Sequence, residues 1–86
     1  NYICIFPNPF NKQTTIRFHL MEETSATLIV YDLFGREVAH LAEEQFLPGE
    51  HQIVWGVQNI PGGVYIIRLE AKNTSITKKL KLEINK

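Results

Sequence analysis

Hydrophobic and polar residues alternate along much of this 86-residue chain. The alternation is clearest between Thr14 and Leu20 and between Val64 and Ala71, where one set of alternate positions is apolar. Because successive side chains of a β-strand point to opposite faces of a sheet, a period of two predicts strands with one buried face. The pattern predicts seven strands in all, at residues 2–6, 14–20, 26–31, 36–41, 51–55, 64–71 and 75–84.

Turn-forming residues separate these strands roughly every 8–12 residues. Glycine, proline and asparagine suit such positions because they tolerate or impose the backbone angles that turns require. The main turn signals are Pro7 and Pro9, Asp32-Leu33-Phe34-Gly35, Pro48-Gly49, Ile60-Pro61-Gly62-Gly63 and Asn73-Thr74. Seven short strands joined in this way predict an all-β, immunoglobulin-like antiparallel β-sandwich, with residues 1–86 forming one domain.

One segment, from residue 37 to residue 47, admits a second interpretation. Val38, Leu41 and Ala42 recur at helical spacing. The run is short, however, and its first half fits better as the hairpin partner of the preceding strand. We therefore expect a polar connection, and no helix, at residues 43–45.

The formal charges cancel but are unevenly distributed. Nine basic and nine acidic side chains remove the long-range attraction that binding to nucleic acid or to an anionic membrane would use, so neither is predicted as a partner. Residues 22–50 are mainly acidic and residues 72–86 mainly basic. This division predicts an attraction between the two segments across a sheet, with a dedicated docking surface as the alternative.

The length and the terminal residues limit the organisation further. A chain this short buries only roughly 60–65% of its unfolded surface, enough for a single core. It contains no apolar run of about 20 residues, so membrane insertion is not expected. Cys4 is the only cysteine, and its apolar surroundings predict that it is buried. Asn1 is not an initiator methionine and no signal peptide follows it, so we expect a piece of a longer protein.

No combination of residues predicts catalysis. His19, His40 and His51 fall on three different predicted strands, and no local motif joins any of them to a serine or to Cys4. The spacing of histidine and cysteine does not match a zinc site. Gly62-Gly63 precedes a strand, whereas a phosphate-binding loop precedes a helix. We therefore expect no catalytic residue, no cofactor and no metal.

Three aromatic residues leave a binding function open. Tyr31, Trp55 and Tyr65 fall on three predicted strands, and exposed rings of this kind stack on sugars. In a sandwich of this size a large aromatic side chain more often fills the core. Core packing is the favoured interpretation, and a non-catalytic carbohydrate-binding or spacer module of an extracellular enzyme is the alternative.

Six ordered segments resemble a known family. They are PNPFN at 7–11, TTIRFHL at 14–20, ATLIVYDLFGREVAHL at 26–41, PGEHQIVW at 48–55, IPGGVYIIRLEA at 60–71 and TKKLKL at 77–82. Together they resemble the type A C-terminal sorting domain of the type IX secretion system. A flagellar hook-capping immunoglobulin-like module shares YDLFGREV and GVY and is a further alternative. The basic C-terminal strand favours the sorting domain.

The resemblance implies structural roles for residues in two turns. Pro7 and Pro9 would hold an extended, non-helical start, and Asn8 and Asn11 would bond the neighbouring backbone. Gly35 would permit a turn with a positive φ angle.

The resemblance also implies which residues carry the sorting signal: Gly63, Tyr65, Arg68, Lys78, Lys79 and Lys81. Gly63 would form a second positive-φ turn. Tyr65 and Arg68 would lie on opposite faces of one strand, with Tyr65 packed and Arg68 exposed. The three lysines match the basic stretch near the C-terminus of the family, and the resemblance implies that the export machinery reads it.

The function that the resemblance implies is that of a C-terminal secretion and sorting signal without enzymatic activity. Its expected partners are a covalently linked N-terminal cargo domain, the type IX outer-membrane translocon, and a sortase-like peptidase that removes the signal and can attach the cargo to the surface. The cargo would pass through the periplasm of a Gram-negative bacterium and end secreted or on the cell surface.

Overall fold

The computed structural model describes residues 1–83, and all regular secondary structure within them is β-strand. The strands are β1 (Tyr2–Phe6), β2 (Gln13–Leu20), β3 (Thr24–Tyr31), β4 (Glu37–Phe46), β5 (Gly49–Gly56), β6 (Gly63–Ala71) and β7 (Thr74–Leu82). Each predicted strand has its counterpart, so the all-β prediction is confirmed. The last predicted strand extended to Ile84, which lies outside the described residues.

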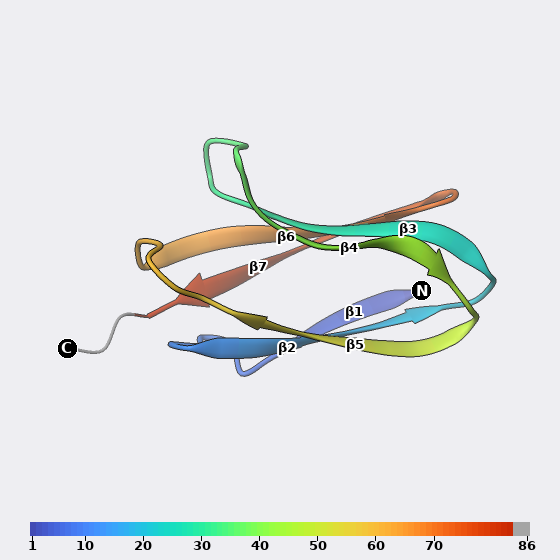
Figure 1. Ribbon diagram of the computed structural model, residues 1–86, viewed down its shortest axis with the longest axis horizontal. Helices are drawn as coiled ribbons and strands as arrows, with labels where there is room; N and C mark the ends of the chain where they lie inside the picture. The colour runs from blue at the N-terminus through green and yellow to red at the C-terminus, as the bar shows by residue number, and fades with distance from the viewer. Residues whose placement is uncertain (84–86) are drawn as a thin grey trace.

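Two antiparallel sheets pack face to face (Figure 1). One has the strand order β1-β2-β5 and the other β4-β3-β6-β7. The hairpins β3–β4 and β6–β7 join neighbours in sequence, whereas β2–β5 and β3–β6 join strands far apart in the chain. The predicted immunoglobulin-like sandwich is therefore confirmed.

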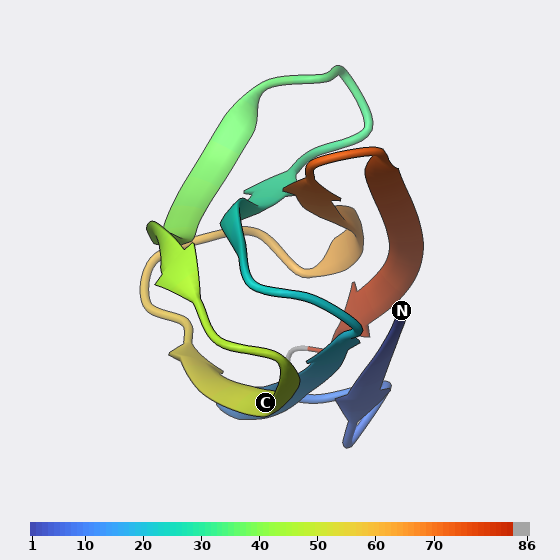
Figure 2. The same ribbon diagram turned by 90° about the vertical axis from the view of Figure 1, so that its right-hand side faces the viewer.

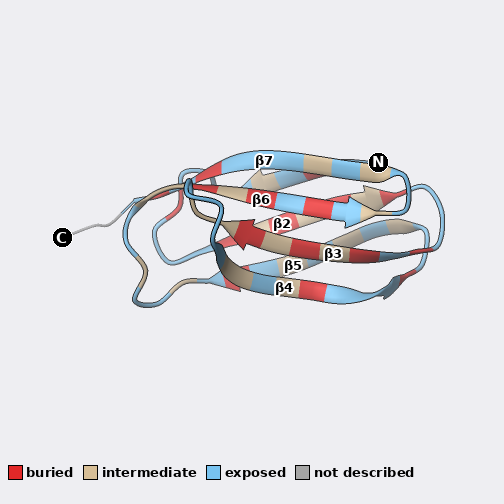
Figure 3. Cartoon of the chain, turned by 90° about the horizontal axis from the view of Figure 1, so that it is seen from above, coloured by how far each residue is buried: buried red, intermediate tan, exposed pale blue. Residues whose placement is uncertain are grey.

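The inward-facing side chains of both sheets meet in one core. Ile16, Phe18 and Leu20 of β2 are fully buried, and so are Ile67 and Leu69 of β6. Figure 3 shows the same alternation as bands of buried and less buried residues along β3 and β6. Each such side chain stabilises the fold by about 1.5–3 kcal/mol on burial, which is why the period-two pattern predicts the sandwich.

Two of the three aromatic residues named above belong to the core. Trp55 and Tyr65 are only 6% and 5% exposed, and their rings meet edge to face with centroids 6.3 Å apart. The core interpretation is confirmed for both. It was wrong for Tyr31, which is half-buried, because the adjacent Val30 takes the inward position at the end of β3.

The prediction for the middle of the chain needs a correction. β4 continues to Phe46, so residues 43–45 form strand and not a polar connection. Their charged side chains are tolerated because β4 is an edge strand with one side open to water. Two register shifts against β3 leave Val38 and Leu41 without direct partners. Such bulges interrupt the period of two, which explains the helical spacing seen in the sequence.

Cys4 is exposed, so the prediction that it is buried was wrong. Its neighbour Ile3 points into the core opposite Phe18 of β2. Since side chains alternate along a strand, Cys4 lies on the outer face together with Tyr2 and Phe6, both of which are also exposed. In this edge strand, alternate residues of an apolar run are therefore exposed to solvent even though the others point toward the core.

Candidate functional site

All six residues assigned to a sorting signal lie on β6 and β7. The register places Tyr65 opposite Leu80, Arg68 opposite Thr77, and Gly63 opposite Leu82. Tyr65 is buried and Arg68 exposed, as expected for opposite faces of one strand. The three lysines of β7 are all exposed: Lys78, Lys79 and Lys81. The two strands thus bring the six residues onto one hairpin.

The turn at Pro7, Asn8 and Pro9 contacts this same hairpin, which sequence analysis did not anticipate. The Asn8 side chain donates through Nδ2 to the carbonyl oxygen of Lys79 at 3.1 Å and accepts through Oδ1 from the backbone N–H of Lys81 at 3.0 Å. The prediction that Asn8 bonds neighbouring backbone was therefore wrong. It bonds a strand 71 and 73 residues away in sequence.

The chain after this turn also pairs with β7. The N–H of Phe10 donates to the carbonyl oxygen of Lys81 at 2.9 Å, and the N–H of Glu83 donates to the carbonyl oxygen of Phe10 at 2.7 Å. Phe10 and Leu82 form a parallel bridge. The N-terminal segment thus leaves the three-stranded sheet at Phe6 and closes the last part of β7 in the other sheet.

The turn between β3 and β4 is held by one carboxylate. Oδ1 of Asp32 accepts from the backbone N–H groups of Phe34 and Arg36, both at 2.9 Å, and Oδ2 accepts from Nε of Arg36 at 2.8 Å. The N–H of Arg36 is the main cause of a lowered pKa for Asp32. Gly35 adopts φ +83° in this turn and Gly63 adopts φ +148° at the start of β6, which confirms both predicted positive φ angles.

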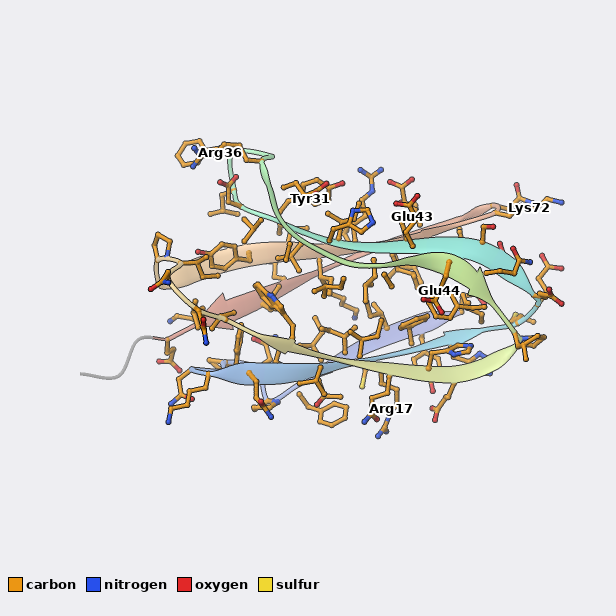
Figure 4. The ribbon with its side chains drawn as sticks, viewed as in Figure 1. Arg17, Tyr31, Arg36, Glu43, Glu44 and Lys72 are labelled. Atoms are coloured by element: carbon orange, nitrogen blue, oxygen red, sulfur yellow. The ribbon has the colours of Figure 1, made fainter. Side chains whose placement is uncertain are left out.

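The same turn presents two large apolar side chains to solvent. Leu33 is 65% exposed and Phe34 85% exposed, and the guanidinium of Arg36 lies over the ring of Phe34 at 5.4 Å. Figure 4 shows Arg36 on this loop, which rises above the four-stranded sheet. A groove of about 310 Å³ separates the turn from Pro61 and Tyr65. The exposed pair was missed because an apolar residue in a turn leaves no periodic signal.

The acidic and basic segments do not face each other. The glutamates of β4 and the lysines of β7 lie at opposite edges of the four-stranded sheet, with β3 and β6 between them. Figure 2 shows β4 and β7 on opposite sides of the sandwich. Among residues 1–83 the ion pairs are local and join Asp32 to Arg36 and Glu70 to Arg68, and the contacts of Glu37 and Glu43 with the His40 ring are local as well. The predicted attraction across a sheet was therefore wrong.

The three histidines lie on separate strands, as predicted. His19 stacks on Tyr2 with ring centroids 5.4 Å apart, and His51 packs against Phe18 and Phe46. Across residues 1–83 no group of three or more histidine, cysteine, aspartate or glutamate residues is arranged to hold a metal ion. The same part of the chain has no helix with the length and hydropathy needed to cross a bilayer.

Comparison with known proteins connects this arrangement to one family. A family model described as secretion system C-terminal sorting domain matches residues 4–83. The match covers all seven strands except the first two residues of β1. No curated protein matches the chain.

Proposed function

Because the chain belongs to the family of secretion system C-terminal sorting domains of the type IX system, we propose that it carries a covalently attached N-terminal cargo across the outer membrane. The family match over nearly the whole chain is the observation that carries this proposal. Type IX sorting implies that the cargo ends outside the cell or at its surface. The domain acts as a sorting signal, and any covalent step is carried out by its partners.

The proposal extends to the individual partners and the route. The cargo reaches the periplasm of a Gram-negative bacterium, where the domain binds the type IX translocon. After export, a sortase-like peptidase removes the domain and can attach the cargo to the surface. Exposed side chains on β6 and β7 support direct contact with a large partner, since they are accessible without unfolding.

We propose that the export machinery recognises the domain through direct contacts with the lysines of β7. Lys79 and Lys81 lie on the outer face of the four-stranded sheet, opposite Ile66 and Val64 of β6. Within residues 1–83 neither lysine makes an ion pair. Their charges are therefore available to carboxylates of a partner.

Replacing both lysines tests this assignment. Lys79→Ala with Lys81→Ala should change the free energy of unfolding by less than about 1 kcal/mol, because exposed charges contribute little, while export of the cargo should fall. The matched control removes two exposed lysines elsewhere, Lys12→Ala with Lys72→Ala, and should export normally. Equal export by both double variants would contradict the role of the β7 lysines.

The function itself is tested by fusing residues 1–86 to a fluorescent cargo that carries an inner-membrane export signal. Surface or medium fluorescence should appear in a bacterium with an intact type IX system and disappear when the translocon gene is deleted. Cargo retained in the periplasm of both strains would refute the sorting function. The carbohydrate-binding alternative loses its support in Trp55 and Tyr65, whose rings are buried.

A further inference from the structure

β7 is an edge strand, and its outer backbone groups are hydrogen-bonded along only part of its length. It pairs with β6 on one side, and Asn8 and Phe10 cover its other side from Lys79 to Glu83. The preceding part of β7, from Ser75 to Lys79, lies near β1, and the side chain of Asn1 donates to Oγ1 of Thr74 at its start. Among the described residues, however, nothing hydrogen-bonds the outer backbone groups of Ser75 and Thr77 or the N–H of Lys79. Figure 3 shows β7 at the edge of the sheet with much of its length exposed.

The contacts of the N-terminal segment show which backbone groups of β7 point outward. Asn8 and Phe10 bond the main chain of Lys79, Lys81 and Glu83, so the odd-numbered residues direct their N–H and C=O groups away from β6. In an antiparallel ladder this direction alternates from residue to residue. The N–H and C=O groups of Ser75 and Thr77, and the N–H of Lys79, therefore also point outward.

These outward groups have no hydrogen-bond partner within residues 1–83. An extended segment of another chain can pair with such a row, because backbone groups supply the affinity and alternate side chains supply the specificity. The opposite edge of the sheet is less suitable. β4 carries two bulges, which twist an edge away from strand pairing, whereas the pairing of β7 with β6 has no register shift.

We propose that β7 receives a strand of the export machinery along Ser75–Lys79, an inference that rests on the proposed sorting function. The added strand alternates acidic and apolar residues. Its outward residues face Lys79, whose charge has no partner among residues 1–83. Its inward residues face Ile76, which is only half-buried.

The charges favour such a partner over a second copy of this chain. Pairing of β7 with another β7 would bring the exposed lysines of both copies to one seam, where like charges repel. An acidic strand instead neutralises them. The added strand would continue the four-stranded sheet by one strand.

Hydrogen exchange of the 86-residue chain measures the pairing directly. The probe is a synthetic octapeptide of alternating glutamate and valine, and the control peptide has lysine in place of glutamate. At millimolar concentration the acidic peptide should slow exchange of the amides of Ser75, Thr77 and Lys79 by about tenfold or more, while the basic peptide has little effect. Unchanged exchange of these amides would overturn the proposal. Protection that rises with protein concentration alone would overturn it in favour of a second copy.

Two variants at one position separate the backbone from the side chain. Thr77→Pro removes an outward N–H that no group of the described chain uses, and edge strands tolerate proline at such positions. Thr77→Ala keeps the N–H. Thr77→Pro should bind the acidic peptide about tenfold more weakly, near the loss of one hydrogen bond, while Thr77→Ala binds as the original chain does. Equal binding by both variants would refute strand addition.

The export assay distinguishes a failure of this inference from a failure of the sorting function. If the unaltered fusion is exported only with an intact type IX system, the sorting function stands, and Thr77→Pro should then reduce export while Thr77→Ala does not. Normal export of a folded Thr77→Pro fusion would overturn strand addition alone. If the unaltered fusion stays in the periplasm, the sorting function fails, and strand addition by the export machinery fails with it. Thermal unfolding of both variants verifies that they are folded.

Discussion

Replacing Asn8 with alanine tests how the N-terminal segment holds the last strand. The variant loses the two hydrogen bonds from the Asn8 amide to the backbone of Lys79 and Lys81. A hydrogen bond within a protein contributes about 0.5–1.5 kcal/mol net. Both bonds are exposed, so water partly replaces them, and we expect a loss of about 1–2 kcal/mol in the free energy of unfolding.

The size of the chain converts this loss into a measurable shift. For a domain of 60–100 residues, each kcal/mol changes the midpoint of thermal unfolding by about 4–8 °C. Circular dichroism during heating and urea titration should both detect the change. Hydrogen exchange should in addition become faster at the amide of Lys81, because its acceptor on Asn8 is gone.

Asn11→Ala is the matched control. Asn11 is exposed and its side chain makes no hydrogen bond among residues 1–83, so its removal should change the free energy of unfolding by less than about 0.5 kcal/mol. If Asn8→Ala and Asn11→Ala unfold alike within that margin, the Asn8 amide does not anchor β7. The account of how the N-terminal turn closes this edge would then be wrong.

Two further predictions concern the core and the β3–β4 turn. Leu69 is fully buried, so Leu69→Ala should reduce the free energy of unfolding, measured by urea titration, by about 2–5 kcal/mol. The control is Val54→Ala, because Val54 is 54% exposed. It should change the free energy of unfolding by less than about 0.5 kcal/mol. The backbone N–H of Arg36, its guanidinium and the N–H of Phe34 donate hydrogen bonds to Asp32 and lower its pKa. The ionised carboxylate therefore stabilises the fold at pH values above the ordinary pKa of 3.8. This stabilisation is lost as the pH falls through the lowered pKa of the folded state. Asp32→Asn should therefore be less stable than the original chain near neutral pH, with a difference that shrinks below pH 3.8, and a difference that stays constant from neutral to acidic pH would contradict this account.

The sequence by itself determined the elements that depend on local chemistry. Alternation along residues 64–71 predicts a strand with Tyr65 inward and Arg68 outward, because side-chain direction is set by position in the strand. The glycine at position 35 predicts a turn with a positive φ angle, because glycine adopts such angles without the strain that a side chain would cause. The order of six segments also pointed to the sorting-domain family, which the family match confirms.

Only the tertiary structure decided which distant residues meet. The sequence places Asn8 next to two prolines and suggests a local turn, but its amide bonds β7, since the return of the last strand to the N-terminal segment is a property of the whole topology. Cys4 is exposed although its neighbours are apolar, because the sheet packing turns Ile3 into the core and leaves Cys4 on the outer face of β1. The bulges of β4 account for the helical spacing of Val38, Leu41 and Ala42, because each inserts a residue that the partner strand does not match. Charge pairing failed as a prediction because attraction requires proximity, and the sheet order keeps the acidic and basic edges apart.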